Sequence, residues 1–393
     1  RHSKTPLTPD EIKYCIHDVK IVCAYIRQKM KEDDNNISLL PLTKTGYVRR
    51  YVREYTLRGK NRCFYKNMIR SLTLETEEYL MAKRAFAGGY THASVIHSGI
   101  ECKDVTSFDF SSSYPTVLIA EKYPMTKGKK IESISKEDFY ELMSNDNLCC
   151  IFTITLTDVH QTFPCESYLS ESRCRKIENS VINNGRIVKA DSLTTDITNV
   201  DFNIIREVYK FEISKIGHLY VYEKYYLPTS FVECILHFYN VKTQLKDIED
   251  KKTEYMNGKE NLNALFGMCV TDIVRELIEY DTDAGWIPPK KLTDEEYNEF
   301  VSNQLDKENE KKGRFLYYLW GVFCTAYARK NLWTGIRECK TDYIYSDTDS
   351  VKILNYEKHK DYFDSYNKEI LSKLETALAY HKLPVELIYP KNI

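Results

Sequence analysis

The sequence lacks several features that assign many proteins to a class directly. Its 56 Lys and Arg and 57 Asp and Glu leave a formal net charge of −1, so no general basic field indicates a polyanion partner. No apolar run approaches the ~20 residues of a membrane-spanning helix, and no signal-peptide pattern opens the chain. We therefore expect no membrane partner, and any polyanion site must be a local concentration of Lys and Arg.

The 12 cysteines lack the spacing of a structural metal site. No pair shows the C-x2-C pattern, Cys149 and Cys150 are adjacent, and the others are scattered among apolar positions. We therefore expect reduced thiols in a cytoplasmic protein rather than disulfides or zinc. The 31 tyrosines suit a protein that stacks on bases, and they suit an AT-rich genome equally well.

The length of 393 residues is sufficient for two or three domains. The chain begins at Arg1 and ends at Ile393 without an initiator Met or a helix stop, so we expect an internal fragment of a longer protein. Residues 9–30 predict a helix, with Thr8 as its N-cap and Pro9 in its first turn. Residues 129–227 alternate β-rich runs with polar loops, which predicts strands.

Two charge runs interrupt the balanced composition. Residues 44–70 contain nine Lys or Arg and one Glu, interleaved with Tyr47, Tyr51, Tyr55, Phe64 and Tyr65. Basic residues between aromatic ones favour a surface that tracks a nucleic-acid backbone and stacks on bases, and a solvated helical face is the alternative. Residues 294–310 contain seven acids and one Lys, which predicts an exposed excursion far from any phosphate.

The segment YIYSDTDSVKI (residues 343–353) places two carboxylates between apolar, β-favouring runs. This pattern predicts a hairpin, here called the acidic hairpin, with Asp347 and Asp349 at its tip. Two carboxylates one residue apart repel and raise each other's pKa, and a divalent cation would neutralise both. An Asp-rich turn capped by its own side chains is the alternative interpretation.

A third carboxylate, Asp109, lies at the end of a strand predicted for residues 105–110. A single Asp in this position is usually a helix N-cap, and Ser111 or Ser112 could share that role for a helix that follows. With the acidic hairpin, Asp109 would complete a set of carboxylates able to bridge two metal ions about 3.5–4 Å apart. In phosphoryl transfer one ion activates the attacking hydroxyl and the other holds the triphosphate.

Residues 229–268 predict an antiparallel pair of helices, with Ser230 and Glu233 as a capping box at the start. Lys242 and Lys246 share one face of the first helix, because they lie four residues apart. The second helix has Lys259, Asn263 and Phe266 on one face, and Gly267 would allow close backbone approach. Cations opposite the acidic hairpin would bind a triphosphate with its magnesium, although each lysine alone is explained by solvent exposure.

Five segments in chain order carry a resemblance to one family. The segments DFSSSYP (109–115), KENLNALFG (259–267) and YSDTDS (345–350) resemble motifs A, B and C of the family B DNA polymerases. The resemblance is to the viral and organellar branch, which includes the protein-primed phage enzymes. FAGG (86–89) is similar to the Tyr-x-Gly-Gly loop that joins exonuclease and polymerase domains there, and YCIHD (14–18) to the third motif of the proofreading exonuclease.

The resemblance implies a role for each matching residue. Asp109 and Asp349 would ligate two Mg²⁺ ions, and Asp347 would assist from the edge of the site. Tyr114 would stack beneath the deoxyribose and exclude a 2′-hydroxyl. The remaining residues would bind the triphosphate (Lys242, Lys246 and Lys259), line the nascent base pair (Asn263 and Phe266), contact DNA (Gly88, Gly89 and Thr348) or belong to the exonuclease (Tyr14 and Asp18).

The fold implied is α+β: a polymerase palm with an antiparallel sheet and helical-hairpin fingers, preceded by a remnant of an α/β 3′–5′ exonuclease domain. Its expected regions are residues 1–40 as the C-terminal piece of the exonuclease domain, 41–85 as a basic connector, 86–128 as palm with motif A, 129–228 as palm with an inserted subdomain, 229–268 as fingers with motif B, 269–315 as a second insertion, and 316–393 as palm with motif C. No Lys-x-Tyr primer motif follows motif C, so we expect the thumb to be missing.

The sequence departs from the family pattern at several positions. Ser113 occupies a position that is usually Leu, Phe266 one that is commonly Tyr, and Phe86 replaces the Tyr of the linker loop. The exonuclease contributes only Tyr14 and Asp18, and one carboxylate cannot hold two metals, so we do not expect this chain to proofread by itself. In protein-primed members, insertions like those expected here contact protein and encircle the template.

We therefore expect a template-directed DNA polymerase of viral-type replication, in the host cytoplasm if a phage encodes it. It would transfer a nucleotide from a dNTP to a primer 3′-hydroxyl with release of pyrophosphate, using two Mg²⁺ ions. Its partners would be primer-template DNA and dNTPs, and a terminal protein primer is a further candidate. A catalytically incomplete DNA-binding fragment is the alternative. The bulky Tyr114 argues against a third possibility, an RNA-synthesising palm enzyme.

Overall fold

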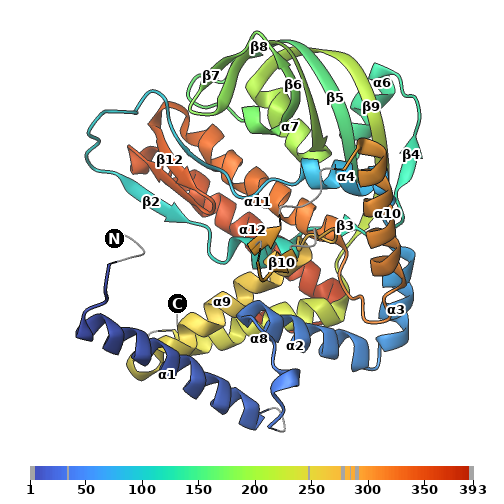
Figure 1. Ribbon diagram of the computed structural model, residues 1–393. Helices are drawn as coiled ribbons and strands as arrows, with labels where there is room; N and C mark the ends of the chain where they lie inside the picture. The colour runs from blue at the N-terminus through green and yellow to red at the C-terminus, as the bar shows by residue number, and fades with distance from the viewer. Residues whose placement is uncertain are drawn as a thin grey trace. The chain divides into compact units, whose positions relative to one another are not determined.

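The computed structural model describes residues 5–32, 35–246, 248–275, 279–283, 285–287 and 292–388 (Figure 1). The chain divides into two compact units, Arg1–Arg50 and Tyr51–Ile393, which are described separately. Within the described ranges, no helix combines the length and the apolar character needed to cross a membrane. All 12 cysteines are free, as the sequence predicts.

The first unit consists mainly of helix α1 (Pro9–Glu32). Its start is fixed by a reciprocal pair of hydrogen bonds, because the backbone N–H of Thr8 donates to Glu11 (2.8 Å) and the Glu11 N–H donates to Thr8 Oγ1 (3.4 Å). The predicted N-cap at Thr8 is thus confirmed. A short 3₁₀ turn (Ile37–Leu39) and the first residues of helix α2 (Lys44–Arg58) follow.

The second unit begins within α2 and continues through α3 (Arg62–Ser71) and α4 (Thr76–Ala85). The aromatic residues of this basic stretch do not form one solvent-facing row. Tyr65 is buried, and its hydroxyl donates to the carbonyl of Phe315 at 2.7 Å. Tyr51 stacks on His237, with ring centroids 5.1 Å apart. The predicted base-stacking surface is therefore wrong for Tyr65, which serves as a core residue.

A seven-stranded antiparallel sheet, here called the large sheet, occupies the region between residues 123 and 225. Its strands are β3 (Tyr123–Pro124), β4 (Lys129–Ile131), β5 (Leu148–Gln161), β6 (Cys174–Glu178), β7 (Val181–Asn183), β8 (Arg186–Thr198) and β9 (Tyr209–Tyr225). Helices α6 (Lys136–Met143) and α7 (Asn199–Val208) cover one part of it, and the rings of Phe139, Phe152 and Phe202 meet edge to face in its core.

A four-stranded antiparallel sheet, here called the small sheet, has the strand order β1-β12-β13-β2 (Figure 1). Its strands are β1 (Thr91–Ala93), β2 (Thr106–Asp109), β12 (Tyr343–Asp347) and β13 (Ser350–Ile353). The predicted strand before Asp109 and the predicted hairpin at residues 343–353 are both confirmed. Helix α5 (Ser113–Ala120) follows β2 directly.

Helix α11 (Tyr318–Cys339) connects the two sheets through one continuous core. Its buried Leu332, Trp333 and Ile336 belong to the same apolar cluster as Phe152 of the large sheet and Val351 of the small sheet. Helix α12 (Lys360–His381) closes the far side of the small sheet, where Phe363 stacks on Phe108 with centroids 3.8 Å apart.

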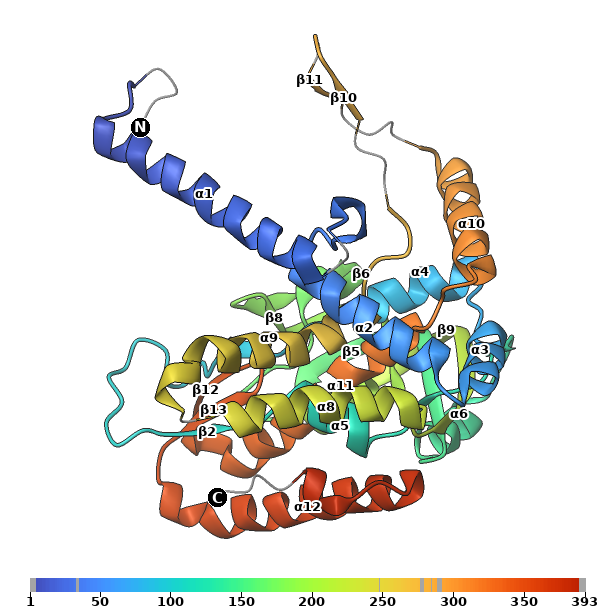
Figure 2. The same cartoon turned by 90° about the horizontal axis from the view of Figure 1, so that it is seen from below.

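Helices α8 (Thr229–Leu245) and α9 (Lys252–Cys269) lie side by side (Figure 2). They run antiparallel, as predicted, because Lys242 near the end of α8 contacts Gly258 in the first half of α9. A Cβ at Gly258 would lie 3.3 Å from the Lys242 backbone, whereas Gly267 faces open space. The close helix–helix approach thus occurs at Gly258, and the close approach expected at Gly267 stays a prediction.

The predicted capping box of Ser230 and Glu233 is also wrong. Helix α8 begins one residue earlier, after Pro228, and its first turn has no side-chain cap. Glu233 instead accepts a hydrogen bond from the Tyr55 hydroxyl at 3.1 Å, so a tertiary contact takes the place of a local one.

The region between α9 and α11 contains a two-stranded ribbon, β10 (Glu279–Asp281) with β11 (Gly285–Ile287), and helix α10 (Asp294–Glu310). Helix α10 is acidic but is not a free excursion, because Val301 and Leu305 are buried and the helix packs against α4. Further 3₁₀ turns lie at Glu171–Arg173, Glu249–Lys251, Lys340–Asp342, Tyr356–Lys358 and Val385–Leu387.

Candidate active site

Three carboxylates from two distant chain segments meet at one edge of the small sheet. In the strand register, Asp347 pairs with Ser350, and Ser350 pairs with Asp109. Asp347 and Asp109 therefore lie in one row across three strands, about two strand spacings (~10 Å between Cα atoms) apart. Asp349 lies in the turn between β12 and β13, and its carbonyl accepts the N–H of Phe110 at 2.6 Å. The predicted convergence of Asp109 with the acidic hairpin is thus present.

The electrostatics of this edge centre on Asp349, which is partly buried while Asp109 and Asp347 are exposed. Burial raises the pKa of Asp349, the charges of Asp109 and Asp347 raise it further, and Lys259 lowers it. Within the described part of the chain, none of the three carboxylates forms an ion pair with Lys or Arg. The edge is therefore crowded with negative charge that protein cations leave largely uncompensated.

The tip of the acidic hairpin is fixed by the glycine loop before β1. Thr348 adopts a left-handed conformation (φ 57°), and its N–H donates to the Tyr90 carbonyl at 2.9 Å. A Cβ at Gly89 would lie 2.6 Å from the Thr348 side chain, so only glycine fits there. Gly88, by contrast, faces open space.

Hydroxyl groups hold the carboxylate of Asp347. Thr91 Oγ1 donates to Asp347 Oδ1 at 3.0 Å, and Thr348 Oγ1 donates to the same oxygen at 3.3 Å. Thr91 was not among the residues predicted from the sequence. Its position two residues after Gly89, in a short β-favouring run, was the available signal.

A wall of cations faces the carboxylates from α8 and α9. The Nζ of Lys242 donates to Ser112 Oγ at 2.9 Å, and Ser112 itself has a left-handed backbone (φ 52°). Burial lowers the pKa of Lys242, and the charges of Lys259 and Lys246 lower it further, whereas Asp109 and Asp349 raise it. Lys242 therefore lies in the field of both the other lysines and the carboxylates.

The remaining sequence-predicted residues of this wall differ in exposure and position. Lys259 and Asn263 are exposed on α9, and Lys246 is the residue that caps the end of α8 rather than a member of it. Ser112 occupies the N-cap position of α5, but its side chain makes no capping hydrogen bond. The predicted capping role is therefore wrong for the Ser112 side chain. Its hydroxyl accepts from Lys242 instead.

Tyr114 and Phe266 form a stacked pair between α5 and α9, with ring centroids 4.2 Å apart and an interplanar angle of 17°. Burial is the main cause that raises the pKa of Tyr114 to about 12, so the hydroxyl stays protonated at neutral pH. The pair, here called the aromatic floor, connects α5, which follows Asp109, with α9, which carries Lys259.

A buried ion pair supports the glycine loop from below. Arg329 of α11 donates to the carbonyls of Ala87 and Gly88, the latter at 2.9 Å, and pairs with Asp201 of α7 at 2.7 Å. The Tyr168 hydroxyl donates to the same carboxylate. Nothing in the sequence pattern identified Arg329 and Asp201, because 128 residues separate them.

Tyr14 and Asp18, the predicted exonuclease remnant, lie four residues apart on α1 in the first unit, and both are exposed. The assignment of these residues to an exonuclease site stays a prediction.

The carboxylate edge has the oxygen ligands that Mg²⁺ prefers. In the described ranges, no group of three His, Cys, Asp or Glu side chains is close enough to enclose a metal ion. Mg²⁺ is commonly held by one or two carboxylates together with water and substrate phosphates, so a complete protein cage is not required. Burial is the largest cause that raises the pKa of Asp349, and the charges of Asp109 and Asp347 raise it further, a repulsion that a divalent cation would relieve.

Comparisons with known proteins identify the family and the relatives of this chain. The sequence profile of the family described as DNA polymerase type B, organellar and viral, matches residues 1–315. The DNA polymerases of Bacillus phages B103 and Nf are 23% and 22% identical to this chain over 369 and 366 residues. Each match covers 91% of this chain and 56% of the relative, so the chain spans little more than half of the relatives' length.

The fold is likewise similar to that of a solved polymerase. Phi29 DNA polymerase complexed with primer-template DNA, in the post-translocation binary complex, matches with a TM-score of 0.63 and 16% identity. The match covers 90% of this chain and 55% of that one. Mixed helices and antiparallel sheets in this arrangement are therefore a known polymerase fold.

Proposed function

The chain belongs to the organellar and viral type B DNA polymerases, and from this premise we propose that its second unit carries the active centre of a template-directed DNA polymerase. The small sheet with α11 would be the palm, and α8 with α9 the fingers. Residues 129–228 and 269–315 would be insertions, residues 41–85 a connector, and residues 1–40 a piece of the exonuclease domain. The proposed reaction is attack of a primer 3′-hydroxyl on the α-phosphate of a dNTP, which forms a phosphodiester and releases pyrophosphate.

One observation carries the proposal: the carboxylates of Asp109, Asp347 and Asp349 share a sheet edge that faces lysines on two helices. Asp109 and Asp349 would hold two Mg²⁺ ions, with Asp347 as an auxiliary ligand. When bound, these ions would lower the pKa of the primer hydroxyl and neutralise charge on the triphosphate.

The lysines would bind the triphosphate directly. Besides burial, the nearby charges of Lys259 and Lys246 lower the pKa of Lys242. The nearby charges of Asp109 and Asp349 raise it, so Lys242 lies close to both groups. A triphosphate between the lysines and the carboxylates would offset the mutual repulsion of the three cations. Lys242 would then exchange its hydrogen bond to Ser112 for one to a phosphate oxygen.

The aromatic floor would select the sugar and the base. Tyr114 would lie under the deoxyribose, where its ring leaves no space for a 2′-hydroxyl. Phe266 supports this ring by stacking on it. Asn263, one turn earlier on the exposed face of α9, would line the nascent base pair.

The glycine loop and the hairpin tip would contact primer-template DNA through Gly88, Gly89 and Thr348. Gly88 has the open side needed for a close approach of a nucleic-acid backbone. A terminal protein that supplies the priming hydroxyl is a further candidate partner.

The test is primer extension by matched carboxylate variants. Asp349→Asn is expected to lower nucleotide incorporation by about 10³-fold, because it removes a group that acts on the charge developing in the transition state. Asp347→Asn is expected to lower it by no more than about 10-fold. Asp364→Asn, which changes an exposed carboxylate of α12, is the control and should leave incorporation unchanged.

Primer-template affinity and the thermal midpoint should remain near the wild-type values in all three variants. Substantial incorporation by Asp349→Asn would refute the proposed metal ligation, and equal losses in Asp347→Asn and Asp349→Asn would refute their division of roles.

A second candidate function is that of a DNA-binding piece without turnover. The wild-type chain would then bind a labelled primer-template but not extend it with any dNTP. Extension by the wild-type chain would exclude this alternative.

A further inference from the structure

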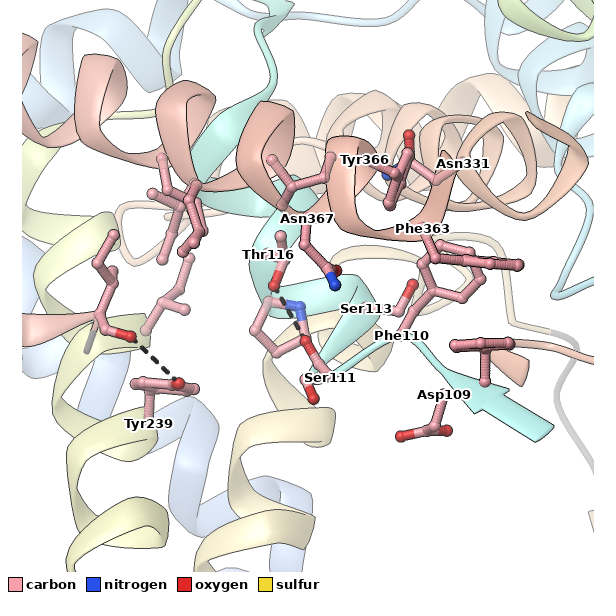
Figure 3. Close-up of a pocket in the computed structure, with 18 of the residues that line it drawn as sticks. Asp109, Phe110, Ser111, Ser113, Thr116, Tyr239, Asn331, Phe363, Tyr366 and Asn367 are labelled. Carbon is pink, nitrogen blue, oxygen red and sulfur yellow. Dashed lines mark hydrogen bonds between the residues drawn. The ribbon is translucent and has the colours of Figure 1, made fainter. Parts of the chain in front are cut away.

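A cavity of about 580 Å³ lies behind the carboxylate edge, between β2, α5, α8, α11 and α12 (Figure 3). Its walls are mainly apolar, with Phe110, Ile119, Leu236, Phe363 and Leu371 among the lining residues. Asp109 lies at the rim, and its carboxylate points away from the aromatic side chains of the cavity (Figure 3). The space is therefore separate from the surface where the carboxylates and lysines face each other.

Ser113 is one reason why this space is open. It is 8% exposed, lies in the first turn of α5, and lines the cavity among apolar neighbours. Buried positions are normally well filled, since protein interiors are close-packed. The small side chain of Ser113 leaves volume that no other described side chain fills.

Polar residues also line the cavity, and Tyr366 is one of them. The hydroxyl of Tyr366 is buried and, among the described residues, has no hydrogen-bond partner. Burial raises the pKa of this hydroxyl, so it remains a neutral donor. Thr116 and Tyr239 are already engaged with the carbonyls of Ser111 (3.3 Å) and Ile388 (3.5 Å), as the dashed lines in Figure 3 show.

The size and chemistry of the cavity match those of a small-molecule site. Ligand pockets of proteins measure roughly 300–1,000 Å³ and combine apolar walls with a few polar groups. A buried donor without a partner costs free energy, which a ligand acceptor would recover. Asn367 adds a second polar group, whose amide points into the cavity beside Ser113 (Figure 3).

We propose that this cavity binds a small bicyclic aromatic molecule with one hydrogen-bond acceptor, which accepts a hydrogen bond from the Tyr366 hydroxyl. Two of its walls, β2 and α5, carry Asp109 and Tyr114, so a ligand here acts on the carboxylate edge from behind. The binding itself is independent of the proposed polymerase function, whereas an effect on nucleotide incorporation rests on that function.

Two probes of the same shape test the site. The carbonyl of 2-acetylnaphthalene supplies the acceptor, and 2-ethylnaphthalene lacks it. Titration followed by ligand-observed NMR is expected to give the acetyl probe a dissociation constant on the order of 10–100 µM. Tyr366→Phe should weaken the acetyl probe about 5–10-fold and leave the ethyl probe unchanged. Tyr380→Phe, on the exposed face of the same helix, is the control and should change neither.

Filling the cavity should abolish binding of both probes. Ser113→Leu adds volume from α5, and Leu371→Phe adds it from α12, so the second variant serves if the first does not fold. Loss of binding in a folded filling variant supports the site. Equal affinity of both probes in wild type, an unchanged affinity of the acetyl probe in Tyr366→Phe, or binding that survives in both folded filling variants would overturn the proposal.

Primer extension provides the second readout. The acetyl probe should lower incorporation without raising the apparent KM for dNTP, and Tyr366→Phe should reduce this inhibition by the same 5–10-fold factor. Competition with dNTP or with DNA would overturn the claim that the site is separate. If the chain extends no primer, the binding measurements still decide whether the site exists.

Discussion

The two antiparallel sheets of the second unit differ in the partners of their carboxylates. The principal strands of the large sheet are 13 to 17 residues long, and two buried acids in or beside it pair with arginines: Asp196 of β8 with Arg84, and Asp201 of α7 with Arg329. The strands of the small sheet are only 3 to 5 residues long, and they present Asp347 and Asp109 to solvent. The partners of Asp347 are hydroxyls rather than cations.

This difference separates the carboxylates that stabilise the fold from those that are available for chemistry. A buried carboxylate that stays ionised must be paired, because an uncompensated charge in an apolar interior costs several kcal/mol. An exposed carboxylate can remain unpaired at little cost, and it is then available to a ligand. We therefore expect substitutions in the support of the large sheet to lower the free energy of unfolding, and substitutions around the small sheet's edge to change activity with little effect on folding.

The largest expected effect on folding concerns Arg329. Arg329→Met leaves Asp201 buried without its partner, so the free energy of unfolding should fall by about 3–5 kcal/mol. Denaturant unfolding measures this change. Arg337→Met is the matched control, because Arg337 lies on the same helix and pairs with Glu207 at the exposed surface. It should cost less than about 1 kcal/mol. Similar losses in both variants would break the distinction between the sheets.

A smaller effect, on selectivity, is expected at Tyr114. Tyr114→Ala removes the ring that would exclude a 2′-hydroxyl, so the preference for dNTP over rNTP in kcat/KM should fall by roughly 10²-fold, or about 2.7 kcal/mol. Tyr114→Phe keeps the ring and should keep the preference. Single-nucleotide incorporation with each substrate measures both variants. If Tyr114→Ala discriminates as well as wild type, the steric role of the ring is refuted.

The smallest expected effect concerns Glu78, an acid of α4 that is buried against the large sheet. Burial raises the pKa of Glu78 to about 7, above its ordinary value of 4.5, although the Tyr222 hydroxyl donates to it. The folded protein therefore favours the protonated form, and the associated stability is present below pH 4.5 and lost as the pH rises to 7. Between pH 5 and pH 8 the free energy of unfolding should lose about 1–2 kcal/mol from this group.

Chemical denaturation at the two pH values measures this loss. Glu78→Gln should remove that part of the pH dependence, because the side chain no longer titrates. Glu141→Gln, at an exposed position of α6, should retain the wild-type profile. A Glu78→Gln variant with the full wild-type pH dependence would show that another group is responsible.

Local sequence signals predicted the elements that depend on neighbours in the chain. The acidic hairpin was predictable because β-favouring residues flank a two-residue tip, and the start of α1 was predictable because Thr8 and Glu11 are three residues apart. The pattern of Lys259, Asn263 and Phe266 predicted one helical face, since it depends only on helix geometry.

Features that depend on distant residues were not predictable in the same way. Glu233 has the spacing of a capping box with Ser230, but Tyr55, 178 residues away, takes its carboxylate. Ser112 resembles an N-cap, but Lys242 reaches its hydroxyl from another helix. In both cases a tertiary hydrogen bond replaces the local one, and no spacing rule in a single sequence reports such a choice.

The contact between Gly89 and Thr348 has a mechanical consequence. The Thr348 side chain packs directly against Gly89, which has no side chain of its own, and the Thr348 N–H donates to the carbonyl of Tyr90, the residue after Gly89. The loop therefore cannot shift toward the tip by a rotamer change, and it cannot shift away without breaking that bond. The loop proposed to hold the nucleic-acid strand and the carboxylates proposed to hold the metal ions are therefore coupled as one rigid unit. A displacement of the strand would displace these carboxylates as well.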